Sequence, residues 1–91
     1  MSLYTLLIDF DGGTYICQAP SKSASSAPIE CVKAWDTSDI EHVVSESDKA
    51  EILSQLEDEE FTPVVGLKKI WFGCVTLRTM LATLNLIETA E

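Results

Sequence analysis

Carboxylates are the side chains of this chain whose number and spacing could do chemistry. Residues 36–60 hold ten of the fifteen Asp and Glu residues against one lysine, Lys49, so this segment alone carries a charge of −9. Paired carboxylates in a cleft could act as general acid and base, but a crowd of them on an exposed helix and its loops is solvated. The Asp-x-Asp-x-Asp-Gly spacing of a calcium loop is absent, and Asp9-Phe10-Asp11-Gly12 fits a hairpin turn better. The segment therefore predicts a charged surface and no metal site.

A thiol and the single histidine, His42, are the other candidates for catalysis. The three cysteines, Cys17, Cys31 and Cys74, show no Cys-x-x-Cys spacing and lie among apolar residues. An odd number with this spacing favours neither a disulfide framework nor a structural zinc site, and thiol activation needs a helix N-terminus or a cationic neighbour. Gly12-Gly13 is no phosphate loop, because neither a Lys-Ser pair nor an opening helix follows it. We expect buried, reduced thiols, no cofactor and no enzymatic activity.

Composition and charge exclude further classes of function. The segments outside 36–60 are nearly neutral, at −1 for residues 1–35 and +1 for residues 61–91. Lysine and arginine supply most of the affinity for phosphate backbones and anionic membranes, so we expect neither nucleic acid nor a membrane as a partner. Asp9 interrupts the first apolar run, and no run approaches the roughly 20 residues of a spanning helix. These features predict a cytoplasmic protein with one domain over residues 1–91.

The elements that must position these residues begin with a hairpin. Apolar residues alternate at Tyr4, Leu6, Ile8 and Phe10, which predicts a strand over residues 3–10. The Asp-Gly-Gly sequence at 11–13 predicts a tight turn, so residues 14–19 should return antiparallel to the first strand, and Pro20 should end the second.

Two helices are expected after a serine-rich connector. The first begins near residue 27 or 28 and runs for about ten residues with an apolar stripe, because proline is tolerated in a first turn. Ser38-x-x-Glu41 has the pattern of a capping box for a short turn through Val44. The second helix spans residues 47–58 and places Ile52, Leu53 and Leu56 on one face.

The C-terminal third is apolar and β-branched. It predicts a strand over residues 69–76, a turn near Arg78-Thr79 and a strand over 81–89, although an apolar helical stripe fits the last segment as an alternative. The expected fold is α+β, with a four-stranded antiparallel sheet of two hairpins and two helices between them packed on one face. The aromatic residues Trp35, Trp71 and Phe72 could line a ligand groove, but we expect core packing.

The first third of the chain resembles the HicB-type antitoxins. The resemblance is carried by the sequence from Tyr4 to Tyr15, in which an aromatic residue and an apolar strand precede the Asp-Gly-Gly turn and a second strand. The serine-rich connector and the absence of paired glutamates in the first helix depart from that family, and we expect no DNA-binding tail after Ala90. No functional residue is therefore transferred from the family. The small, acidic α+β domain is also similar in type to the bacterial immunity proteins that neutralise basic toxins.

These observations lead to two hypotheses. The first is a protein-binding module that neutralises a basic partner, such as a toxin or nuclease domain, by electrostatic docking and occlusion. The alternative is a homo-oligomeric structural or small-ligand-binding domain, in which the apolar residues 64–90 supply the interface of a homodimer. For the first hypothesis, we expect the partner to contact Asp36, Asp39, Glu41, Glu51, Glu57, Asp58, Glu59 and Glu60.

Overall fold

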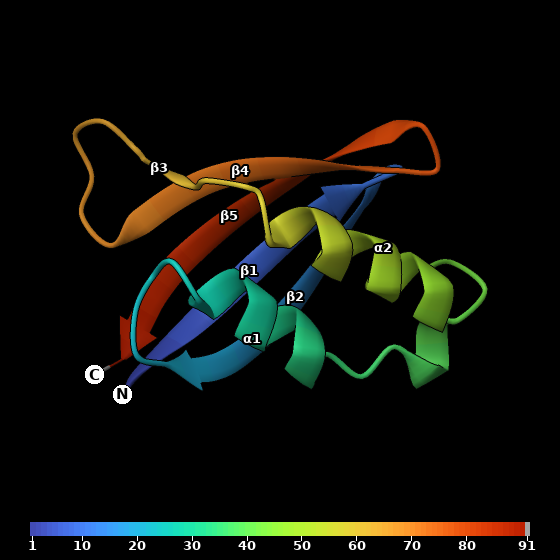
Figure 1. Cartoon of the computed structure of the whole chain (residues 1–91), viewed down its shortest axis with the longest axis horizontal. Coiled ribbons are helices and arrows are strands. Elements are labelled where there is room, and N and C mark those ends of the chain that lie inside the picture. Colours follow the sequence, from blue (N-terminus) through green and yellow to red (C-terminus); the bar gives the residue numbers. More distant parts are fainter. Residues whose placement is uncertain (91) are drawn as a thin grey trace.

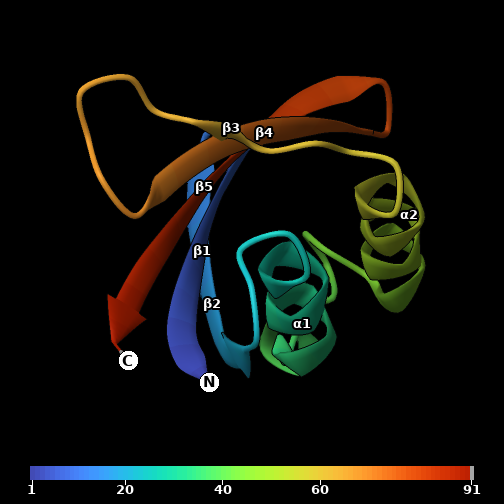
Figure 2. The ribbon, with the colours of Figure 1, turned by 60° about the vertical axis from the view of Figure 1, so that its left-hand side comes forward.

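The computed structural model describes residues 1–90 and shows a sheet covered by helices on one side. Five antiparallel strands form the sheet, in the order β2-β1-β5-β4-β3. The strands are β1 (Ser2–Phe10), β2 (Gly13–Ser21), β3 (Thr62–Pro63), β4 (Ile70–Leu77) and β5 (Met80–Ala90), and the α-helices are α1 (Ala27–Ala34) and α2 (Glu46–Leu56). Both helices lie on the same side of the sheet (Figures 1 and 2). The α+β class and the one-sided packing of the helices are as predicted.

The predicted N-terminal hairpin is confirmed, with Tyr4 opposite Ala19 and Ile8 opposite Tyr15. Asp11 and Gly12 have φ angles of 49° and 81°, so both central residues of the turn are left-handed, as a tight hairpin requires. The expectation that Pro20 ends the second strand is wrong, because β2 continues to Ser21. Since β2 is an edge strand, a proline can face away from β1 without breaking the ladder.

The last segment is a strand, and the helical alternative is wrong. β5 pairs with β4 across the turn at Arg78-Thr79, with Leu77 opposite Met80. β5 also pairs with β1, which places the C-terminal strand in the middle of the sheet. A central strand buries alternate apolar side chains, so Ala82, Leu84 and Leu86 are in the core.

The predicted number of four strands is corrected to five. The fifth strand, β3, has only two residues, in which Thr62 lies opposite Phe72 and Pro63 opposite Trp71. Two residues carry no alternation that a sequence pattern could reveal, and their pairing depends on the neighbouring strand.

The predicted capping box at Ser38 and Glu41 does not form. A short 3₁₀ helix covers Ser38–Ile40, and its N-cap is Thr37, without a side-chain hydrogen bond. The capping box belongs instead to α2, where Ser45 Oγ accepts from the Asp48 N–H at 3.2 Å and Asp48 Oδ2 accepts from the Ser45 N–H at 2.9 Å. Both segments have the serine-to-acid spacing, and the second also gains a tertiary partner.

That tertiary partner is Arg78, at the tip of the C-terminal hairpin. Its guanidinium lies 3.2 Å from Asp48 Oδ2, donates to the Val43 carbonyl and stands 5.4 Å from the centroid of the Phe10 ring. One side chain therefore joins the β4–β5 turn to the start of α2 and to the tip of the N-terminal hairpin.

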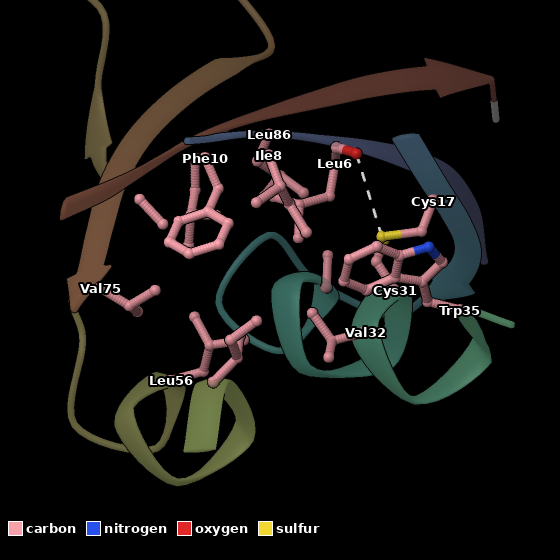
Figure 3. Close-up of a cluster of buried hydrophobic side chains, with 14 of the residues drawn as sticks. Leu6, Ile8, Phe10, Cys17, Cys31, Val32, Trp35, Leu56, Val75 and Leu86 are labelled. Carbon is pink, nitrogen blue, oxygen red and sulfur yellow. Dashed lines mark hydrogen bonds between the residues drawn. The ribbon is translucent and has the colours of Figure 1, made fainter. Parts of the chain in front are cut away.

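The core lies between the inner face of the sheet and the two helices (Figure 3). Leu6, Ile8 and Leu86 extend from the central strands toward Val32 of α1 and Leu56 of α2. The helices have eight and eleven residues, lengths at which isolated helices are marginal, so packing on the sheet maintains them.

The two edges of the sheet differ. Beyond the two residues of β4 that pair with β3, the Cys74 N–H donates to Glu59 Oε2 at 3.3 Å. Further along, the Gln55 side chain accepts from the Thr76 N–H at 2.7 Å and donates to the Thr76 carbonyl. At the opposite edge, the register of the tight hairpin means that the N–H and C=O groups of Thr14, Ile16 and Gln18 point away from β1. The edge of β4 is thus covered by side chains, whereas the sheet ends at β2.

The β4–β5 turn contains a residue that is poorly suited to its backbone. Arg78 and Thr79 have φ angles of 50° and 65°, and the side chain of Thr79 is exposed. A left-handed conformation costs an L-residue roughly 1–2 kcal/mol. Glycine adopts it without this steric cost, but it loses more chain entropy on folding, which costs about 0.5–1 kcal/mol.

We therefore expect Thr79→Gly to raise the free energy of unfolding by about 0.5–1 kcal/mol, measured by urea denaturation. Thr83→Gly is the matched control: it lies inside β5, where no positive φ is needed, and should destabilise the protein. A destabilised Thr79→Gly variant would contradict the strain at this turn.

Candidate functional site

The carboxylates that the sequence assigns to partner binding lie before, on and after α2. We call them the acidic belt: Asp36, Asp39, Glu41, Glu51, Glu57, Asp58, Glu59 and Glu60. The first three lie between α1 and α2, Glu51 is on α2, and the other four follow its C-terminus. All are exposed except Glu59, which is half-buried. Their elements are on the helical side of the sheet (Figure 2). The structure therefore places the belt along the helical layer as far as its border with β4, where Glu59 and Glu60 lie.

Few of the acidic residues of this layer are used internally. Arg78 neutralises Asp48, which is buried and is not part of the belt. Lys49 donates to the Trp35 carbonyl, so this lysine also supports the packing of the helices. Asp36 Oδ1 accepts from the Ser38 N–H at 3.0 Å, and this hydrogen bond lowers the pKa of Asp36. The Asp36 carboxylate is therefore ionised at neutral pH.

A cleft opens at the end of the belt where α2 gives way to β3. Its volume is about 310 Å³, and its lining residues are Ala24, Ser25, Glu59, Glu60, Phe61 and Trp71. The two glutamates belong to the belt, and the two aromatic residues are half-buried. The cleft thus combines carboxylates with aromatic rings.

The two aromatic residues of the cleft each pack against a neighbouring residue of the sheet. A Cβ atom on Gly73 would lie 2.8 Å from the Phe61 ring, so this ring packs directly on the glycine backbone. The Trp71 ring lies 6.2 Å from the Tyr4 ring, centroid to centroid, at an interplanar angle of 52°. Burial raises the pKa of Tyr4, with a further contribution from Glu88. Tyr4 is therefore a neutral support for Trp71 at physiological pH.

Sequence reasoning considered Trp71 as a possible groove residue and missed Phe61. The available signal was Gly73, an isolated glycine inside a strand, which often marks the close approach of another group. The expected core role holds for Trp35, which is 8% exposed. It is wrong for Phe72, which is 43% exposed on the side of the sheet away from the helices.

Two of the three thiols are hydrogen-bonded in the core, whereas the histidine is exposed. Cys17 Sγ donates to the Leu6 carbonyl and Cys31 Sγ to the Tyr4 carbonyl, at 3.9 Å and 3.5 Å, and both cysteines are buried as predicted. Burial raises the pKa of Cys17 to about 12 and that of Cys31 to about 11. Cys74 is only half-buried, and His42 is exposed in the loop before α2. In residues 1–90, no group of three or more His, Cys, Asp or Glu residues could hold a metal ion.

Comparisons of the chain with protein-family models, with curated proteins and with solved structures give no match. No helix within residues 1–90 is both long and apolar enough to cross a membrane.

The raised thiol pKa values predict how stability depends on pH. In the unfolded chain the thiols ionise near the ordinary value of 9.0, whereas the folded protein keeps Cys17 and Cys31 protonated to higher pH. Their contribution is complete below pH 9 and is lost as pH rises from 9 to about 11 for Cys31 and about 12 for Cys17, because ionisation then favours the unfolded state. The free energy of unfolding, measured by urea denaturation between pH 8 and 10, should fall.

The double variant Cys17→Ala/Cys31→Ala should show a shallower fall than wild type. Alkylation of the native wild-type protein, followed by mass spectrometry, should label Cys74 first. Equal labelling rates for the three thiols would contradict the protected state of Cys17 and Cys31.

Proposed function

We propose that this protein is a protein-binding domain whose acidic belt docks onto a basic surface of another protein. The observation that supports the proposal is the exposure of seven of the eight belt residues in the segments before, within and after α2, with the eighth half-buried. Most basic residues lie outside the segment that carries the belt: Lys22 is between β2 and α1, Lys68 and Lys69 are between β3 and β4, Arg78 is in the β4–β5 turn, and Lys33 is exposed at the end of α1. A surface of one sign attracts a partner of opposite charge over about 8 Å, the Debye length at physiological ionic strength.

The belt charges and the packed contacts contribute to binding in different ways, because their interaction energies differ. An exposed ion pair contributes only about 0.2–1 kcal/mol and is screened by salt, so the belt mainly accelerates the encounter. Residence time has to come from a few well-packed anchors. The mechanism is therefore steering by the belt followed by coverage of the partner's surface.

A toxin or nuclease domain is the class of partner that we propose. Surfaces that bind nucleic acid are rich in lysine and arginine, and an acidic domain that covers such a surface blocks access of the phosphate backbone. This occlusion is the mode of action that the similarity in type to immunity proteins and antitoxins implies.

The test compares two variants with the same change in net charge. Glu57→Lys/Glu60→Lys reverses two exposed belt charges, and Asp9→Lys/Glu30→Lys reverses two exposed charges outside the belt. Immobilised wild-type and variant proteins are used to capture basic proteins from a lysate of the source cells, and association rates of the captured protein are then measured at several ionic strengths.

The wild-type association rate should fall steeply with added salt. At low salt, the belt variant should associate at least tenfold more slowly, whereas the control should remain within about twofold of wild type. An association rate that is independent of ionic strength, or equal effects of the two variants, would contradict the proposal.

The uncovered side of the sheet supports a second candidate, a homodimer. Neighbouring strands place Ile16, Leu7, Asn85 and Phe72 in one row, and Ile87 and Ile70 lie opposite each other in the next row. We call this surface the open face. Ile16 is 60% exposed and Phe72 is 43% exposed. Trp71, Val75 and Leu77 project to the other side.

Charge and size make a second copy the suitable occupant of the open face. Each chain carries −9, but the belt lies on the opposite side, and Asp9 is the one carboxylate among the β1, β2 and β4 residues of this face. The molecule measures 34 × 23 × 23 Å, so a whole face can supply the roughly 800 Å² per partner of a standard interface. Two copies joined by their open faces would keep both belts exposed.

Sedimentation velocity at several protein concentrations tests the homodimer. Wild type should sediment as a dimer, and Ile16→Ser/Phe72→Ser should shift the protein to a monomer. Val65→Ser/Leu67→Ser, which alters two exposed apolar residues between β3 and β4, should leave the dimer intact. A wild-type monomer at every concentration, or equal effects of the two variants, would count against this candidate.

A further inference from the structure

We propose that the cleft at the end of the acidic belt binds the guanidinium group of an arginine that the partner protein presents. The inference rests on the proposed function. It identifies the packed contact that would give the complex its residence time, which the exposed charges of the belt do not provide. It depends on four features of the cleft: its size, its chemistry, its rigidity and its position.

The size of the cleft suits one long side chain. Small-molecule sites usually occupy about 300–1,000 Å³, and this cleft, with about 310 Å³, lies at the lower end of that range. A nucleotide or an extended cofactor would need more room, whereas a single arginine side chain would be largely enclosed.

The chemistry of the lining selects a cation. The lining contains two acidic residues, Glu59 and Glu60, and two aromatic residues, Phe61 and Trp71, and no lysine or arginine is among its described residues. A cation above an aromatic face gains about 0.5–2 kcal/mol, and the gain grows as water is excluded. An anion would be repelled, and a neutral ligand would leave the carboxylates without a charged partner. Arginine fits better than lysine because its planar group can stack on a ring while it donates to carboxylates.

The walls are in place before any ligand arrives. Phe61 is fixed against Gly73, and Trp71 rests against Tyr4. Glu59 Oε2 accepts from the Cys74 N–H, which holds this carboxylate beside the strand. A prearranged site loses little entropy when the ligand binds, so more of the contact energy remains as affinity.

The position of the cleft connects it to the belt. Glu59 and Glu60 belong to both, so a basic surface steered by the belt arrives with its charged side chains next to the aromatic wall. The belt therefore governs the rate of association, and the cleft governs the rate of dissociation.

An NMR titration with short peptides tests the cleft itself. The probe is acetyl-Gly-Arg-Gly-amide, and the control is the same peptide with citrulline, which has a similar shape but no charge. The indole N–H signal of Trp71 should shift with the arginine peptide at millimolar concentration. The indole signal of the buried Trp35 should not move, and the citrulline peptide should have at least fivefold weaker affinity. Equal affinities for the two peptides, or an unchanged Trp71 signal, would overturn the proposal.

Variants assign the binding to the lining. Trp71→Leu and Glu60→Gln should each weaken binding of the arginine peptide at least fivefold, and Glu46→Gln, an exposed carboxylate at the start of α2, should not. Because Glu60 is exposed, its substitution tests the cleft even if the change at Trp71 disturbs folding. Binding that survives Glu60→Gln undiminished contradicts the assignment.

Kinetics with the captured basic partner separate failure of the cleft from failure of the proposed function. Trp71→Leu should raise the dissociation rate at least tenfold and leave the association rate within about twofold. If Trp71→Leu has no effect while Glu57→Lys/Glu60→Lys slows association, the cleft proposal fails and the proposed function stands. If the arginine peptide binds but no basic protein associates in a salt-dependent manner, the proposed function fails instead.

Discussion

The coverage of only one face of the sheet by two short helices is the constraint on which the rest of the structure depends. Leu6, Ile8 and Leu86 are buried because α1 and α2 lie across them, and each helix is kept in place by that contact. The helices have to expose their polar side to water, and there the sequence places its carboxylates. The other face of the sheet has no such cover and remains partly apolar. Most of the negative charge and the uncovered apolar surface therefore lie on opposite sides of the sheet.

Arg78 and Lys49 neutralise little of the acidic belt, although Lys33 also adds an exposed positive charge on α1. Arg78 is engaged by Asp48, Val43 and the Phe10 ring, and Lys49 is engaged by the Trp35 carbonyl. Both cations thus fasten the helical layer to itself and to the hairpin tips. They stabilise the elements that carry the acidic belt and pair with none of its carboxylates. Lys49 only adds to the effect of the Ser38 hydrogen bonds, which lower the pKa of Asp36. Charges of one sign near each other cost stability, and here tertiary contacts at the ends of α2 offset that cost.

Local chemistry decided how much of the fold and of the site was predictable from the sequence. The alternation from Tyr4 to Phe10 and the Asp-Gly-Gly turn predict the first hairpin correctly, because both signals lie within a few residues. The capping box was assigned to Ser38, since its spacing matches that of Ser45 and the deciding partner, Arg78, is thirty residues beyond Asp48. β3 and the packing of Phe61 on Gly73 escaped prediction for the same reason: each is defined by the backbone of β4. The exposure of the belt follows from composition, whereas the cleft beside it does not.

The unequal edges of the sheet restrict how copies of this domain could join through their backbones. Gln55, Glu59 and the two-residue β3 occupy hydrogen-bonding groups along β4, so β2 is the one long edge strand of the described sheet that another strand can join. Two chains that paired along β2 would use up the free edge of both. Strand addition along β2 would therefore stop at two members, because neither chain would keep a free β2 edge.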